Sequence, residues 1–192
     1  MPEKLVIIGA GGVGREIAAV LKKHPLPGYD LAGFIDDGLS EGTIIKGYPV
    51  LGGIQWVLDN ATDLAVILAF GNPQLRKKIV QKLQVVSLVY PTLIHPNVSI
   101  HDEESVVIGQ GCYIADGCIL TTDIIVGDYC FLNTSCTLQH DSKVGTYSVL
   151  MPGVRITGGA TIGSSVYIAP NCFIATNAVI NNDAILNESI LT

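Results

Sequence analysis

The chain has 192 residues, of which 48% are hydrophobic and 15% charged, and its formal net charge is −6. An acidic balance argues against a nucleic-acid partner, which would require basic patches. Because the sequence contains neither a signal peptide nor a long apolar span, we expect a soluble, cytoplasmic protein.

The N-terminal part of the chain alternates apolar runs with amphipathic stretches. Buried strands are predicted at residues 4–8, 31–35, 64–70 and 85–90, and helices at residues 15–23 and 74–83. Apolar runs separated by helices indicate β-α-β units with a parallel sheet. We therefore expect a Rossmann-like α/β domain over residues 1–90.

A glycine-rich segment joins the first predicted strand to the first helix. It reads Gly9-Ala10-Gly11-Gly12-Val13-Gly14 and fits G-x-G-x-x-G, in which glycines let backbone N–H groups approach an anion at a helix N-terminus. Asp36 follows the second strand, where a ribose-binding acid is expected. The sheet is too short for a complete dinucleotide fold. We therefore favour a nucleotide or nucleotide-sugar over NAD, and a purely structural tight turn is the remaining alternative.

A fixed period of six residues governs the second half of the chain. From Ile108 to Leu186 every sixth residue is aliphatic. Neither a helix nor an ordinary strand has this period. It describes a three-sided β-coil, in which about 18 residues complete one turn and successive coils stack through parallel hydrogen bonds. The sequence therefore predicts a parallel β-helix over residues 91–192.

The fourth residue after each of these aliphatics is mostly small, as a corner inside a narrow prism requires. All five cysteines occupy this position, namely Cys112, Cys118, Cys130, Cys136 and Cys172. Free cysteine packs as a small buried hydrophobe. We therefore expect reduced thiols in the core, with neither a disulfide nor a metal site.

The chain combines a glycine loop at 9–14, the strand end Phe34-Ile35-Asp36-Asp37, Gly71-Asn72 with Arg76, and hexads carrying Asn133 and His140-Asp141. This combination resembles the PglD/NeuD-type bacterial sugar acetyltransferases, which include UDP-4-amino-sugar N-acetyltransferases and sialic acid O-acetyltransferases. The resemblance covers almost the whole chain. It implies a left-handed parallel β-helix, a homotrimer, and acetyl-coenzyme A bound between neighbouring helices.

The resemblance also implies roles for individual residues. His140 falls at the position of the family's general base, and Asp141 at that of its acidic partner. Asn133 is a candidate hydrogen-bonding group for the thioester or the base. The positions that hold the nucleotide-sugar are Gly11, Gly12, Val13, Asp36, Asp37, Gly71 and Gln74. Val13 and Val149 each replace a histidine of the family, the first at the sugar nucleotide and the second at the coenzyme.

Candidate contacts to acetyl-CoA surround His140. One turn of the coil places Gly158 beside His140, and we expect Gly158 and Gly159 to leave the wall bare for the pantetheine arm. Lys143 and Arg155 are the only bases after residue 93, so they are the available counter-charges for the coenzyme's phosphates. The candidate contacts are Val149, Gly158, Gly159, Pro170, Lys143 and Arg155.

The predicted reaction needs a proton acceptor that works near neutral pH. Attack of an amine on a thioester releases a proton, and histidine, with an ordinary pKa of about 6.5, suits that task. Asp141 would fix the imidazole tautomer. Adjacent residues of a strand face opposite ways, so the pair requires a corner between His140 and Asp141.

We predict an enzyme that transfers the acetyl group of acetyl-CoA to an amino sugar linked to a UDP-type nucleotide. O-acetylation of a sugar or sialic acid is the alternative within enzymes. A non-catalytic trimeric scaffold that binds sugar nucleotides is the alternative from another class. A metal hydrolase is disfavoured because the spacing of His95 and His101 does not resemble a metal site. We expect no metal, nucleic-acid or membrane partner.

Overall fold

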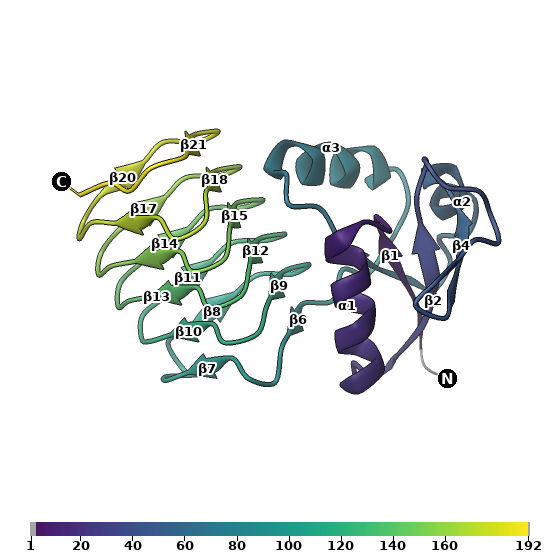
Figure 1. Cartoon of the computed structure of the whole chain (residues 1–192), viewed down its shortest axis with the longest axis horizontal. Coiled ribbons are helices and arrows are strands. Elements are labelled where there is room, and N and C mark those ends of the chain that lie inside the picture. Colours follow the sequence, from purple (N-terminus) through teal and green to yellow (C-terminus); the bar gives the residue numbers. More distant parts are fainter. Residues whose placement is uncertain (1–2, 192) are drawn as a thin grey trace. The chain divides into compact units, whose positions relative to one another are not determined.

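The computed structural model describes residues 3–191, and the chain divides into two compact units (Figure 1). The first unit comprises the chain up to Phe70 together with Lys78–Pro91, and the second comprises Gly71–Lys77 and the chain from Thr92 onward. Helix α3 (Pro73–Leu83) therefore begins in the second unit and ends in the first.

A mainly parallel sheet forms the first unit. Its strand order is β3-β4-β2-β1-β5, with β1 (Glu3–Ile8), β2 (Tyr29–Ile35), β3 (Ile44–Ile45), β4 (Tyr48–Gly52) and β5 (Leu64–Leu68). Strand β1 pairs in parallel with both β2 and β5, so it is central and its apolar side chains are buried. Helices α1 (Gly12–Lys23) and α2 (Ile54–Asp59) supply crossovers between parallel strands. No helix within residues 3–191 is long and apolar enough to span a bilayer.

Most predicted elements of the first unit are confirmed, with ends shifted by a few residues. The strand predicted at 85–90 is wrong, because Val85 is 79% exposed and only an isolated bridge joins Val89 to Ala65. The sequence reasoning also missed β3, β4 and α2. These elements are too short for hydrophobic periodicity to reveal them.

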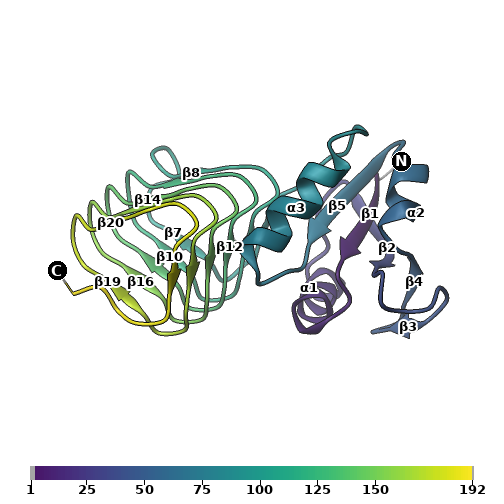
Figure 2. The same ribbon diagram turned by 90° about the horizontal axis from the view of Figure 1, so that it is seen from above.

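Three parallel sheets, here called walls 1, 2 and 3, form the three sides of the coil in the second unit (Figure 2). Wall 1 contains β6 (Leu93–Ile94), β9 (Tyr113–Ile114), β12 (Phe131–Leu132), β15 (Val149–Leu150), β18 (Tyr167–Ile168) and β21 (Ile185–Leu186). Wall 2 contains β7 (Ser99–Ile100), β10 (Ile119–Leu120), β13 (Thr137–Leu138), β16 (Arg155–Ile156) and β19 (Phe173–Ile174). Wall 3 contains β8 (Val107–Ile108), β11 (Ile125–Val126), β14 (Lys143–Val144), β17 (Thr161–Ile162) and β20 (Val179–Ile180).

The predicted six-residue register is confirmed. Each strand from β8 to β21 ends on one of the repeating aliphatics, and those from Ile114 to Ile174 are at most 2% exposed. All five cysteines are free and buried at the small inner position, as expected. Corner residues such as Asp123 and Asp141 adopt positive φ, which the tight turns between walls require. This repeated stacking of parallel sheets fits the left-handed β-helix that the resemblance implies.

Arg76 is the one fully buried charged side chain among the described residues, and it lies on the outer face of wall 1. Its Nε donates to the Tyr129 carbonyl oxygen at 2.8 Å, and its guanidinium carbon lies 6.0 Å from the centre of the Phe131 ring. Burial lowers the pKa of Arg76 to about 10, so the group stays charged at neutral pH. Backbone carbonyls and the face of an aromatic ring thus replace its water shell.

Candidate active site

His140 and Asp141 lie at the corner where the chain passes from wall 2 to wall 3. The Asp141 N–H donates to the Thr122 carbonyl oxygen one coil earlier at 3.3 Å, and the Gly159 N–H donates to the His140 carbonyl oxygen at 2.9 Å. The predicted neighbours of His140 along the stack are therefore confirmed. One row of this corner runs through Thr122, His140 and Gly158, each one coil from the next.

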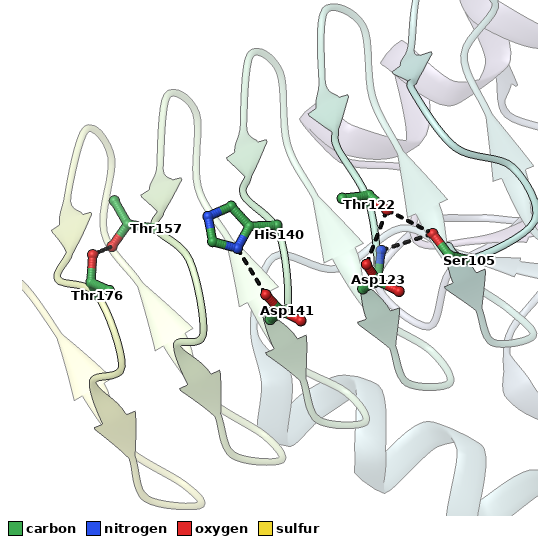
Figure 3. Close-up of polar contacts among 7 residues, drawn as sticks. All are labelled: Ser105, Thr122, Asp123, His140, Asp141, Thr157 and Thr176. Atoms are coloured by element: carbon green, nitrogen blue, oxygen red, sulfur yellow. Dashed lines mark hydrogen bonds and ion pairs between the residues drawn. The ribbon is translucent and has the colours of Figure 1, made fainter.

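The His140 imidazole is held by its neighbour Asp141 (Figure 3). Asp141 has φ of +62°, a left-handed conformation that aspartate tolerates better than most residues. This turn brings Oδ2 of Asp141 to 2.8 Å from Nδ1 of His140, so the required corner is confirmed. A carboxylate only accepts, so Nδ1 carries the proton and Nε2 keeps its lone pair. Within the described residues Nε2 has no hydrogen-bond partner, and the two side chains are 61% and 66% exposed.

The wall beside His140 is not bare, which corrects one expectation. Gly158 is buried, and a Cβ built on it would lie 2.5 Å from Cε1 and 2.8 Å from Nε2 of His140. The imidazole itself therefore occupies the space that the missing side chain leaves. Gly159 has φ of +70°, a conformation that favours glycine at the turn. The pantetheine arm that we expected at Gly158 would have to lie on the outer side of the ring.

The coil before His140 carries a closed polar network (Figure 3). The Thr122 hydroxyl lies 3.1 Å from Oδ2 of Asp102 and 3.1 Å from Oδ2 of Asp123, and the Ser105 hydroxyl donates to Asp102 at 2.7 Å. Hydrogen bonds from Ser105 and Thr122 lower the pKa of the Asp102 carboxyl group. The Thr122 hydroxyl thus bonds within its own coil, and among residues 3–191 the imidazole has Asp141 as its one polar partner.

The two bases of the β-helix flank this corner. Lys143 is in β14 of wall 3, and Arg155 is in β16 of wall 2. Both side chains are exposed, and neither makes an ion pair within residues 3–191. Their contact with the phosphates of the coenzyme remains a prediction.

Three other candidates lie away from this corner. Asn133 and Pro170 follow strands of wall 1 and sit at the corner between walls 1 and 2. Asn133 is 9% exposed and its side-chain oxygen accepts from the Thr134 N–H at 2.8 Å, and within residues 3–191 it makes no hydrogen bond to His140. Val149 is fully buried in wall 1 between Phe131 and Tyr167. Contact of Val149 with the coenzyme remains a prediction.

The glycine loop lines an open hollow in the first unit. Gly14 is needed for packing, because a Cβ there would collide with the Gly9 carbonyl oxygen. Gly11 and Gly12 have no such neighbour within 4 Å and are exposed, so they are free to approach a ligand, with the half-buried Val13 beside them. The hollow has a volume of about 510 Å³ and is lined by Ala10, Gly11, Arg15, Asp36, Gly38, Leu39, Thr43, Ile44 and Ile45.

Asp36 and Asp37 both hold backbone groups. Oδ2 of Asp36 accepts from the Ala10 N–H at 2.9 Å and Oδ1 accepts from the Gly38 N–H at 2.9 Å, so this carboxylate fixes the glycine loop at the edge of the hollow. Oδ1 of Asp37 accepts from the Ile54 N–H at 2.7 Å and so caps the start of α2. Contact of either residue with a substrate remains a prediction.

The remaining substrate candidates, Gly71 and Gln74, belong to the second unit. The Gln74 side-chain amide donates to Oδ1 of Asp183 at 2.8 Å. Both candidates line a hollow of about 380 Å³ with Asn72, Pro73, Ser165, Tyr167, Asp183 and Ile185. Within residues 3–191 no group of three or more His, Cys, Asp or Glu side chains is arranged to hold a metal ion.

Residues 4–83 match the family model of the PglD N-terminal domain. The match begins in β1 and ends with α3, so it includes the glycine loop, Asp36, Asp37, Gly71 and Gln74.

Several solved structures are similar to the whole chain. The acetyltransferase domain of PglB from Neisseria gonorrhoeae in complex with acetyl-coenzyme A has a TM-score of 0.73 and 21% identity, over 100% of this chain and 100% of that one. A mutant of perosamine N-acetyltransferase from Caulobacter crescentus in complex with CoA and GDP-perosamine has a TM-score of 0.71 and 22% identity, over 97% and 90%. WeeI from Acinetobacter baumannii has a TM-score of 0.64 and 27% identity, over 98% and 93%. A search of curated proteins finds no match.

The family model over residues 4–83 and the fold shared with these structures agree with the family resemblance drawn from the sequence. The sequence reasoning missed two features of the second unit. One is the place of Gly71–Lys77 in that unit. The other is Ser165, whose buried hydroxyl has no partner within the described residues and lines the hollow beside Gln74. Neither carries a local sequence signal, because both depend on contacts between distant segments.

Proposed function

We propose that the protein is an acetyl-CoA-dependent N-acetyltransferase that acts on an amino sugar linked to a nucleotide of the UDP type, with His140 as general base. The observation that carries the proposal is the exposed pair at the corner of walls 2 and 3. There Asp141 lies 2.8 Å from Nδ1 of His140, and the His140 side chain is 61% exposed. A base with this tautomer accepts a proton at Nε2.

In the proposed reaction the amine nitrogen of the sugar attacks the thioester carbonyl carbon. The new C–N bond forms, the C–S bond breaks, and the sulfur leaves as the coenzyme thiolate. His140 takes the proton that the amine loses and then delivers it to the thiolate. Asp141 stabilises the imidazolium between these steps. This chain's own contribution is thus a positioned proton carrier, of the kind worth about 10²–10⁴ in rate.

Acetyl-CoA is proposed to lie along the same corner. Lys143 and Arg155, one on each adjoining wall, supply positive charge for its phosphates. Gly159, at the turn beside the ring, has no side chain that would obstruct the coenzyme. The PglB domain and the perosamine enzyme, which have this fold, were solved with acetyl-coenzyme A and CoA respectively.

We further propose a homotrimer with active sites shared between subunits. A single wall offers only a shallow surface to a long coenzyme, whereas two walls make a groove. Asn133 and Pro170 lie at a different corner from His140, so within this scheme they reach the site only from a neighbouring copy. Light scattering that gives a monomer able to turn over acetyl-CoA would refute this arrangement.

The nucleotide part of the acceptor is assigned to the hollow of the first unit, which we treat as Rossmann-like. Gly11 and Gly12 have open space above them at the N-terminus of α1, where backbone N–H groups and the helix dipole favour phosphate. The perosamine enzyme was solved with a GDP-linked sugar, which supports a nucleotide-linked acceptor as a class.

The test is turnover of acetyl-CoA with a panel of acceptors. UDP- and GDP-linked amino sugars are compared with free sialic acid, and released coenzyme thiol is measured together with the mass of the product. We expect amide formation on a UDP-linked amino sugar. Ester formation on a sugar or on sialic acid would favour O-acetylation instead. Tight binding of nucleotide-sugar without turnover of any acceptor would identify a non-catalytic scaffold.

A further inference from the structure

His140 lies two residues after a repeating aliphatic, and only one residue at this position of the repeat is a glycine. Every residue two places after a repeating aliphatic, from Gln110 to Glu188, carries a side chain except Gly158. The same corner has Thr122 before His140 and Thr176 after Gly158. The one glycine at this position of the repeat is therefore one coil away from the one histidine at the same position.

Backbone geometry does not explain this glycine. Gly158 is not among the residues of positive φ, so alanine fits its conformation, whereas its neighbour Gly159 has φ of +70°. Packing against the next coil does not explain it either. The three nearest atoms to a Cβ at position 158 are Cε1, Nε2 and Nδ1 of His140, at 2.5, 2.8 and 3.1 Å. The only group that a methyl there is shown to displace is the imidazole.

We propose that Gly158 is a positioning residue for His140. It supplies a recess in the next coil in which the imidazole lies, and Asp141 supplies the hydrogen bond that fixes its rotation. The proposal rests on the proposed function, since it assigns how the base of that reaction is held. The Asp141 contact alone leaves a ring that is 61% exposed free to swing about it, because one hydrogen bond does not fix a plane. The recess limits rotation of the ring on the side of Gly158 and keeps Nε2 pointing along the corner between walls 2 and 3.

Figure 3 shows the ring leaning toward the coil that carries Thr157 and away from the Thr122 network. Beyond the recess, the Thr176 hydroxyl donates to Thr157 at 3.2 Å, and the Thr157 hydroxyl donates to the Ile174 carbonyl oxygen at 2.7 Å. Neither hydroxyl is directed to the imidazole. The His140 ring thus bonds to the Asp141 carboxylate and lies against Gly158.

The test substitutes Gly158→Ala and compares it with His140→Ala and with the double variant. The ring is the mobile partner, so we expect Gly158→Ala to keep the fold and displace the imidazole. A displacement of about 1 Å at a catalytic group costs about 10²-fold, so kcat should fall by about 10–100-fold with the KM of acetyl-CoA changed less. In the double variant the methyl has nothing to displace. Its kcat should equal that of His140→Ala, which is the matched control.

A second readout does not depend on turnover. The ring nitrogens of His140 are assigned by ¹⁵N NMR of the free protein, using His140→Ala to identify its signals among the four histidines. We expect the wild type to show one dominant tautomer with the proton on Nδ1, and Gly158→Ala to shift toward the tautomer mixture of a free imidazole. Gly158→Thr, which restores the residue found at positions 122 and 176, should shift it further.

The outcomes separate this proposal from the proposed function. Unchanged ring signals in Gly158→Ala would overturn the positioning role, whatever the activity. A raised KM for acetyl-CoA with unchanged kcat and unchanged ring signals would assign Gly158 to coenzyme contact instead. A shifted tautomer in a protein that acetylates no acceptor would leave the recess established and the proposed function refuted.

Discussion

The two units hold their candidate functional residues in different ways. In the β-helix, His140 stands at one position of a repeat, and its surroundings follow from residues one coil before and one coil after it. In the first unit, Asp36 and Asp37 make contacts that occur once, to Ala10, Gly38 and Ile54. The comparison teaches that a repeat makes the surroundings of a residue readable from sequence spacing, whereas a one-off turn does not.

The strongest challenge to this comparison is a change in the repeat itself. Leu132→Asp places a carboxylate among stacked aliphatics at a fully buried position. An unpaired buried charge costs several kcal/mol or more, comparable with the whole stability of a domain, so we expect the β-helix not to fold. Far-UV circular dichroism and a thermal melt measure the result. The control is Val179→Asp, at the outward position of its hexad with 71% exposure, which should fold. A soluble Leu132→Asp protein with an unchanged melting temperature would show that the register is wrong.

The next largest effect concerns the corner pair. His140→Ala removes an exposed side chain and opens no cavity in the core, so the fold should be kept while kcat falls by about 10²–10⁴. Steady-state kcat and KM of the wild type and the variant, with far-UV circular dichroism to check the fold, measure the result. Asp141→Asn should cost less, because the imidazole stays but loses the charge that favours its cation. Near-full activity of His140→Ala would place the base elsewhere.

Spacing was enough to predict what the repeat controls. It predicted the buried aliphatics, the inner cysteines and the neighbours of His140. It could not predict that the imidazole fills the space above Gly158, because side-chain orientation depends on the left-handed turn at Asp141.

In the first unit the sequence predicted the central strands and the glycine loop but misread the segment 85–90. That run is apolar, yet Val85 and Val89 are exposed and the segment makes only one bridge. Local composition favours a strand there, and the absence of a paired neighbour decides against it. The same limit applies to Asp36, since its position suggested a ribose contact and its hydrogen bonds to Ala10 and Gly38 came only from the fold.

Substitutions at Asp36 test whether a contact that occurs once in the first unit also contributes to substrate binding. Asp36→Ala should raise the KM of the nucleotide-sugar by about tenfold, the worth of a hydrogen bond to a charged group, and leave the KM of acetyl-CoA nearly unchanged. Because Asp36 also holds the Ala10 N–H, Asp36→Asn is the control, as it keeps one acceptor for the loop and removes the charge. If both KM values are unchanged in Asp36→Ala, the glycine loop has only a structural role and the acceptor sugar is not linked to a nucleotide.

The prediction with the smallest effect tests whether loss of a single contact destabilises only the elements close to it. Asp37→Ala removes the acceptor for the Ile54 N–H at the start of α2, a cap worth about 1 kcal/mol. Asp59 serves as the control in the same helix, because its side chain only accepts from the exposed Gln55 amide at 2.9 Å, and such exposed pairs contribute about 0.2–0.5 kcal/mol. Hydrogen exchange should show faster opening of the amides of α2 and β4 in Asp37→Ala than in Asp59→Ala, with the amides of walls 1 to 3 unchanged in both. The β-helix amides should be insensitive because each coil is held by its neighbours and not by this cap. Loss of protection throughout the walls in Asp37→Ala would mean that the two units unfold as one, and the contrast between repeat and single contact would then not extend to their stability.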